Sequence, residues 1–238
     1  LSPLELGRLQ QVRELFKEQS GDGEERIPGA FVALLDVKPI QQNGPQCGLV
    51  ATAMALSYLG FGDFSAADLL ERARAAGFSK QGEMFSADDL AALAVSAAAA
   101  SLSASVTAFP SSLSLLTEVT TGSAVLVPYD SDKNNEPAHR KGHAAHWAII
   151  AGATLVDDRA GGELASLSAD VNLDDVDSGR IFVLAYHGKS KHLGVWEADA
   201  LRASNAQLHE ASPELTRNGD FIIKDETLGG LRDKIVVL

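Results

Sequence analysis

The stretch "QQNGPQCGLV", Gln41–Val50, contains Cys47, the only cysteine among 238 residues. A single cysteine cannot form a disulfide within its own chain, so other chemistry must be considered for its thiol. Gly44 and Pro45 predict a turn, and an apolar run at helical spacing follows Cys47 as far as Gly60. We therefore expect Cys47 at the N-terminus of a helix, where the helix dipole and free backbone N–H groups stabilise a thiolate.

Two interpretations of Cys47 compete on these residues. The first is a small, buried apolar side chain at the start of a helix, a common environment for unpaired cysteines. The second is a nucleophile, with Gly48 leaving space for a substrate to approach the sulfur. Gln41 lies six residues upstream, where its amide could join the Cys47 N–H around a developing oxyanion. The spacing and the turn favour the nucleophile.

A nucleophilic cysteine needs a general base, and His146 is the preferred candidate among six histidines. It lies in "HAAHWAIIAG", residues 143–152, whose apolar end predicts a central strand. A strand would hold His146 rigidly with its ring in a cleft, while Trp147 faces the opposite side. The alternative is a core histidine that hydrogen-bonds to the backbone.

Three histidines also follow an H-x3-H-x2-H pattern that suggests a metal site, namely His139, His143 and His146. Gly142 lies between the first two and a strand follows, so the helix that would align them is not expected. No glutamate lies between them to act as a base, unlike the helical zinc-protease motif.

The segment "DSDKNNEP", residues 130–137, begins like a calcium-binding loop. Its sixth position is Asn135 instead of glycine, and its twelfth is Lys141 instead of glutamate. We interpret it as a loop without metal that leads into the His146 strand. No metal or other cofactor is therefore expected.

The order of helix and strand patterns predicts an α+β fold in a single domain, 1–238, with two lobes and a cleft between them. Residues 1–20 are expected to form an N-terminal helix, 21–122 a mainly helical lobe, and 123–238 a mainly β lobe. The predicted helices cover residues 47–59, 66–76, 87–100, 111–121 and 198–204. The predicted strands cover 30–37, 103–109, 123–129, 143–153, 180–188, 191–196, 219–225 and 233–238.

Composition excludes several classes of protein. A hydrophobic content of 45% and a charged content of 22% are typical of a globular chain. The net charge of −12 argues against nucleic acid or an anionic membrane as a partner. No apolar run approaches the roughly 18 residues that span a bilayer. A lone cysteine without a visible secretory segment favours the cytoplasm.

Five ordered blocks resemble one family of peptidases: "GPQCGLVA", "VPYDSDKNNEP", "RKGHAAHWAIIAG", "HGKSKHLGVW" and "SNAQL". The Gln-x5-Cys-Gly and His-Trp elements are similar to papain-like cysteine peptidases and to bacterial double-glycine leader peptidases. The blocks together resemble the actin maturation proteases, over about residues 40–238. This resemblance implies a papain-like fold, with a helical lobe carrying the cysteine and an antiparallel β lobe carrying the histidine.

The resemblance also implies an activity, namely removal of the acetylated N-terminal Met or Cys from immature actin to expose an acidic N-terminus. Actin would be the substrate, and profilin–actin a partner of a full-length protein. Cys47 would be the nucleophile, His146 the general base and acid, and Gln41 the oxyanion donor. Two alternatives stay open: a papain-like peptidase with another peptide substrate, or a peptide-binding module without catalysis.

Papain-like enzymes orient the histidine with a third residue, and three candidates remain for it. They are His187 at the end of the next long strand, Asp158 in a short hairpin, and Asn205 in "SNAQL". The acidic actin N-terminus would also need local positive charge. Candidate substrate-binding residues are Gly48, Trp147, Arg140, Lys141 and Lys189.

Overall fold

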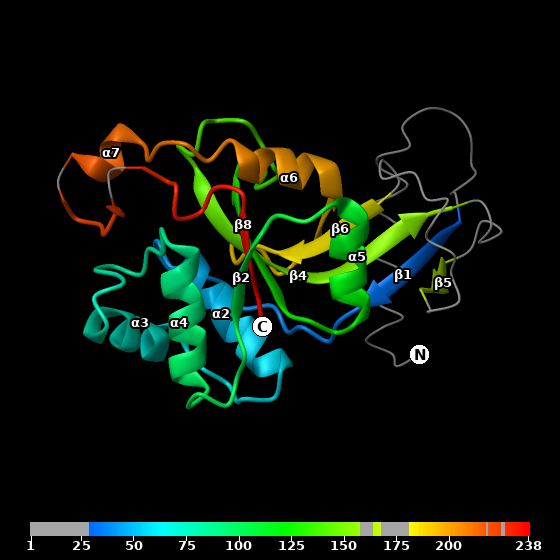
Figure 1. The fold of residues 1–238 in the computed structure, drawn as a ribbon, viewed down its shortest axis with the longest axis horizontal. Coiled ribbons are helices and arrows are strands. Elements are labelled where there is room, and N and C mark those ends of the chain that lie inside the picture. The colour runs from blue at the N-terminus through cyan, green and yellow to red at the C-terminus, as the bar shows by residue number, and fades with distance from the viewer. Residues whose placement is uncertain (1–28, 158–163, 168–180, 218, 225–226) are drawn as a thin grey trace.

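The computed structural model describes residues 29–157, 164–167, 181–217, 219–224 and 227–238 (Figure 1). The helix predicted over 1–20 and the candidate Asp158 lie outside these ranges. The expected α+β class is confirmed, since helices pack on a mainly antiparallel sheet. Helix α2 begins at Cys47, and strand β4 contains His146, so the two residues come from the two kinds of structure as expected.

An eight-stranded sheet runs through the described part of the chain. Its strands are β1 (Ala30–Leu34), β2 (Ser105–Ala108), β3 (Val125–Asp130), β4 (Ala145–Val156), β5 (Leu164–Ser166), β6 (Ile181–Tyr186), β7 (Gly194–Glu197) and β8 (Lys234–Val237). The β1–β5 pair is parallel, and the other strand pairs are antiparallel. Two strands of the first half of the chain, β1 and β2, thus join the sheet of the second half.

Strand β4 is the centre of this sheet because it is long enough to pair with three other strands. Its first part, Ala145–Ile150, pairs with β3, and its second part, Gly152–Val156, pairs with β1 along the same edge. Strand β6 pairs with the other edge. Every residue from His146 to Val156 is buried, which explains the continuous apolar run in this segment.

Six helices are described: α2 (Cys47–Tyr58), α3 (Ala66–Ala75), α4 (Ala87–Ala97), α5 (Ser112–Thr120), α6 (Ala198–Ala206) and α7 (Pro213–Thr216). Helix α2 is buried along nearly its whole length, as expected for a helix that is apolar on all sides. It packs against β4 as well as against α3 and α4. In the ribbon view α2, α3 and α4 gather below the sheet at one end of the molecule, and α6 lies above it (Figure 1). Ser65 and Ser86 cap α3 and α4, because their side chains accept from the backbone N–H groups of Asp68 and Asp89.

The strand predicted over residues 219–225 is wrong. The described part of this segment contains no strand, although Phe221, Ile222 and Ile223 form a short apolar run typical of one. Its backbone bonds to side chains instead of a neighbouring strand: the N–H of Ile222 donates to the Glu83 carboxylate, and the carbonyl of Gly219 accepts from Lys80. Side-chain partners of this kind leave no pattern that periodicity can detect.

A buried carboxylate at the end of β3 fixes the loop that leads into β4. Asp130 is fully buried, and its two oxygens accept hydrogen bonds from the backbone N–H groups of Arg140, Gly142 and Ala144, at 2.6–2.9 Å. The side chain of Gln207, just after α6, donates a further bond at 3.0 Å. Four donors compensate for the burial of this charge. The "DSDKNNEP" segment is therefore organised by its first aspartate.

We expect Asp130→Asn to destabilise the fold by about 3 kcal/mol, because an amide would place N–H groups against backbone donors in a buried site. Urea unfolding at neutral pH measures this change. The matched control is Asp233→Asn, since Asp233 is exposed and its closest cation, Arg232, lies 3.7 Å away. The control should change the free energy of unfolding by less than about 0.5 kcal/mol. Equal effects of the two substitutions would contradict the role of Asp130.

Candidate active site

Cys47 is the first residue of α2, as its sequence position predicts. The turn before it follows the expected chemistry, since Gly44 has a positive φ of 72° and its carbonyl accepts from the N–H of Gln46. No side chain caps this helix end. The first N–H groups of α2 therefore keep their bonding capacity for a thiolate or a substrate oxygen.

Gly48 serves packing, which differs from the expected role in substrate access. A Cβ atom at this position would lie 2.9 Å from Cβ of Met84 and 3.1 Å from the ring of Trp147. The indole N–H of Trp147 donates to the Met84 carbonyl at 2.7 Å. The missing side chain thus lets α2 approach β4 closely enough to bring Cys47 to the strand.

His146 is oriented by a backbone carbonyl. Its Nε2 lies 2.6 Å from the carbonyl oxygen of His187, the residue that follows β6. Because β6 pairs with β4, the end of β6 is delivered next to His146. Tyr129 lies opposite His146 on β3 and packs edge-on against its ring at 5.7 Å. The ring of His146 is held between two neighbouring strands.

This hydrogen bond fixes the tautomer of His146. A carbonyl oxygen can only accept, so Nε2 must carry the proton and donate it. In the neutral imidazole, Nδ1 is then the unprotonated nitrogen with a free lone pair. Nδ1 is the atom that can take a proton from a nearby thiol.

Burial disfavours the charged form of both groups. It lowers the pKa of His146 to about 3, against 6.5 for an ordinary histidine, and the positive charge of Lys189 acts in the same direction. Burial also raises the pKa of the Cys47 thiol, which the N–H groups of Trp147 and Gly48 and the charge of Lys189 only partly offset. The helix end alone predicts a lowered thiol pKa, so the net direction is the opposite of that expectation. The resting pair is therefore a neutral thiol and a neutral imidazole.

Cys47 and His146 line the same pocket, a cavity of about 190 Å³. Its other walls come from four parts of the chain: the turn before α2, the segment before α4, the loop after β6 and the C-terminal segment. The lining residues are Gln42, Pro45, Cys47, Glu83, Met84, Phe85, Ala145, His146, Trp147, Lys189, Leu215, Phe221 and Leu231. The structure thus brings the predicted nucleophile and base together.

Of the two adjacent glutamines, the structure places Gln42 in the pocket. Gln41 is exposed and does not line it. The backbone N–H of Gln42 donates to the Gly188 carbonyl, which fixes its position beside the loop after β6. Its side-chain Nε2 donates to the carbonyl of Gly44 at 2.8 Å, which leaves one of the two amide hydrogens for another acceptor. The Gln-x5-Cys spacing therefore selected Gln41, whereas its neighbour Gln42 lines the pocket.

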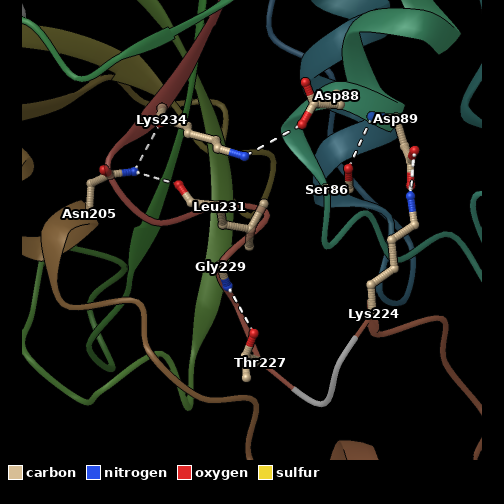
Figure 2. A network of polar contacts seen from close by, with 9 residues as sticks. All are labelled: Ser86, Asp88, Asp89, Asn205, Lys224, Thr227, Gly229, Leu231 and Lys234. Atoms are coloured by element: carbon tan, nitrogen blue, oxygen red, sulfur yellow. Dashed lines mark hydrogen bonds and ion pairs between the residues drawn. The ribbon is translucent and has the colours of Figure 1, made fainter.

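The three candidates for orienting His146 have different outcomes. His187 occupies the orienting position through its backbone carbonyl, while its ring lies 6.2 Å from that of His146. Asn205 is buried on α6, where its amide donates to the Pro128 carbonyl. It also donates to the carbonyls of Leu231 and Lys234, as Figure 2 shows. Asn205 therefore ties helix to sheet, and no hydrogen bond joins it to His146 among the described contacts. Asp158 lies outside the described residues.

The basic candidates for substrate binding differ in whether they line the pocket. Lys189 lines the pocket, whereas Arg140 and Lys141 are exposed residues of the loop held by Asp130. The possible metal set does not assemble in the described ranges, where no cluster of three or more His, Cys, Asp or Glu could hold an ion. His143 instead lies 3.1 Å from Glu210. Within the same ranges, no helix has the length and apolarity needed to cross a membrane.

Comparison with known proteins places the chain among its relatives. Residues 37–154 match the family model described as actin maturation protease-like, C-terminal domain. The actin maturation protease of Xenopus tropicalis is 36% identical over 232 residues, covering 91% of this chain and 75% of that protein. The human one is also 36% identical, over 217 residues, and the chain spans 61% of its length. The Drosophila melanogaster protein is 35% identical over 196 residues, 64% of its length.

Among solved structures, a Bacillus anthracis protein assigned to the C39-like peptidases matches 87% of this chain and 96% of its own. The TM-score is 0.47 and the sequence identity is 12%, a level of similarity that carries no conclusion about this chain.

We expect the buried His146 to make the fold less stable as the pH falls from 7 to 5. Its pKa is about 3 in the folded state and 6.5 in an ordinary setting, so the unfolded chain binds a proton that the folded chain does not. Stability is full above pH 6.5 and is lost as the pH falls towards 3, by about 2 kcal/mol between pH 7 and pH 5. Urea unfolding at pH 7 and pH 5 measures this change. The free energy of unfolding should fall by about 2 kcal/mol more in the wild type than in His146→Gln.

His192→Gln is the matched control, since His192 is exposed. It should keep the full pH dependence of the wild type. A wild-type loss no larger than that of His146→Gln would show that His146 is not buried in its neutral form.

Proposed function

The chain belongs to the actin maturation protease family, and from this premise we propose that it is a cysteine peptidase that removes the acetylated N-terminal Met or Cys of immature actin. The observation that supports this most directly is the shared pocket of Cys47 and His146. The His187 carbonyl leaves Nδ1 of His146 as the only basic ring nitrogen. We treat the chain as one peptidase domain, 1–238.

The first half of the proposed reaction acylates Cys47. The thiol proton moves to Nδ1 of His146 as the sulfur bonds to the carbonyl carbon of the acetylated residue. Because both groups are neutral at rest, this transfer accompanies the attack instead of preceding it. The tetrahedral intermediate then expels the amine, which takes the proton from His146. The new amine is the N-terminus of mature actin.

The second half regenerates the enzyme. His146 takes a proton from a water molecule as that water attacks the thioester carbon. The carbon–sulfur bond breaks, the released acetylated amino acid leaves as its carboxylic acid, and the proton returns to Cys47. The His187 carbonyl supports the imidazolium in both halves, because it accepts from Nε2 throughout.

Gln42 supplies the oxyanion donor in this proposal, together with the backbone N–H of Cys47. The support is its place in the pocket and its unused amide hydrogen. Its side-chain oxygen is buried without a hydrogen-bond partner among the described residues. That oxygen can bind only a donor, so a substrate oxygen bonds instead to the spare hydrogen on Nε2.

Lys189 is the proposed contact for the acidic residues of actin that follow the scissile bond. It is exposed yet lines the pocket next to the loop bonded to Gln42. The remaining chain is strongly acidic, so a single cation at this place has a large influence on which peptides approach. Actin, alone or bound to profilin, is the proposed partner, and the cytoplasm is the proposed location.

We expect the purified protein to release acetyl-Met from the peptide acetyl-Met-Asp-Asp-Glu, as read by mass spectrometry. Cys47→Ala should lower kcat/KM by about 1,000-fold or more, because the nucleophile is lost. Replacing the two aspartates of the peptide by asparagines should raise KM in the wild type and change it little in Lys189→Met. Undiminished cleavage by Cys47→Ala would contradict the proposal.

The two glutamines give a matched pair of variants. Gln42→Ala should lower kcat by roughly 100-fold, since one oxyanion donor is removed. Gln41→Ala, one position away and exposed, should change kcat by less than about twofold. The reverse order of effects would return the oxyanion role to Gln41.

A further inference from the structure

One wall of the pocket comes from a segment that the reaction above does not use. Residues 213–217, 219–224 and 227–231, called here the C-terminal strap, contribute Leu215, Phe221 and Leu231 to the lining. Leu231 is almost fully buried, and Leu215 and Phe221 are half-buried. In Figure 1 the strap runs from α7 back to the sheet at the same end of the molecule as α3 and α4. The strap therefore connects α7 to β8 and contributes to one wall of the pocket.

Glu83 attaches the strap to the opposite wall. Glu83 is 3% exposed, and its carboxylate accepts from the N–H of Ile222 in the strap at 3.0 Å. It also accepts from Ser79 and from the N–H groups of Lys80 and Gln81 in the loop before α4. These bonds outweigh the effect of burial and lower the pKa of Glu83, so the carboxylate stays ionised at neutral pH.

Further bonds hold the strap along the same wall. Lys224 forms an ion pair of 2.8 Å with Asp89 in the first turn of α4 (Figure 2). The carbonyls of Gly219 and Asp220 accept from the side chains of Lys80 and Gln81. Closer to β8, a Cβ on Gly230 would lie 2.7 Å from the Phe85 carbonyl, so the two backbones are in direct contact. The strap is tied to the helical wall at several separate points.

The pocket has two chemically different parts. Gln42 and Lys189 are joined through the bond from Gln42 to Gly188 and form a polar part. Met84 and Phe85 belong to the wall that bonds the strap, and with Leu215, Phe221 and Leu231 they form an apolar part. An acidic peptide chain is complementary to the polar part. The acetylated Met or Cys is complementary to the apolar part.

Glu83 fits an uncharged group at the apolar part. A carboxylate has about four lone-pair sites, and four donors from Ser79, Lys80, Gln81 and Ile222 occupy those of Glu83. Glu83 therefore has no lone pair left to bind a free α-ammonium group. An acylated residue carries no such group.

We propose that the C-terminal strap restricts this peptidase to the first residue of its substrate, by closing the apolar part of the pocket where a longer chain would have to continue. This inference rests on the proposed function, because it assigns the apolar part to the residue that is removed. The cavity of about 190 Å³ supports it, since pockets for larger ligands usually exceed about 300 Å³. Phe221 and Leu215 are the residues that set the limit.

The test compares two peptides, acetyl-Met-Asp-Asp-Glu and the extended acetyl-Gly-Ala-Met-Asp-Asp-Glu. The wild type should cut the Met–Asp bond of the extended peptide with a kcat/KM lower by roughly 100-fold, because the added residues clash with the strap. Phe221→Ala and Leu215→Ala should each raise the ratio of extended to short cleavage by about tenfold. Phe109→Ala is the matched control, a half-buried phenylalanine outside the pocket, and should leave the ratio unchanged.

The outcomes separate the two proposals. If the wild type releases no acetyl-Met from the short peptide, the proposed function fails. If it cuts both peptides at similar rates, only the strap proposal fails. An unchanged ratio in both strap variants, with the short peptide still cut, also overturns it. Loss of both cleavages in both variants without a change in urea midpoint overturns it too, since the strap would then be needed for the chemistry.

Discussion

The burial of Asp130 is the constraint on which the site depends. A carboxylate at the fully buried end of β3 must find donors, and the donors available are the backbone of the following loop and Gln207. When these donors bond to the carboxylate, residues 139–144 fold against the end of β3, and β4 begins at Ala145. His146 is the next residue. The position of His146, the proposed catalytic base, thus depends on a hydrogen-bond requirement at a residue that does not itself line the pocket.

Hydrogen bonds of this kind also join sequence blocks that lie far apart in the chain. "SNAQL" follows "VPYDSDKNNEP" by more than sixty residues, yet Ser204 bonds to both the N–H and the carbonyl of Asp130, and Asn205 bonds to Pro128. "HGKSK" begins with the carbonyl that orients His146 and continues with Gly188, which accepts from Gln42. The blocks that resemble the peptidase family are therefore the segments that build and support one pocket.

Sequence reasoning found the elements that have a periodic signal. The helix starting at Cys47, the caps at Ser65 and Ser86, and the strand of His146 all follow from local patterns. It also named His187 for the orienting position, from its place at the end of the next long strand, but it could not name the atom. A backbone carbonyl orients His146, and every residue has a carbonyl, so residue type alone left His187, Asp158 and Asn205 open. The choice between Gln41 and Gln42 likewise depends on how the turn at Gly44 closes, which spacing does not determine.

The pocket lining is also the origin of the neutral resting pair. It buries His146 and part of Cys47, and so removes solvation that an imidazolium and a thiolate need. Ion-pair formation then depends on what enters the pocket. A bound acyl group allows charge to pass from sulfur to the substrate oxygen, where Gln42 can stabilise it. A site of this kind gains selectivity over unrelated thiol reactions, at the cost of a less reactive cysteine when empty.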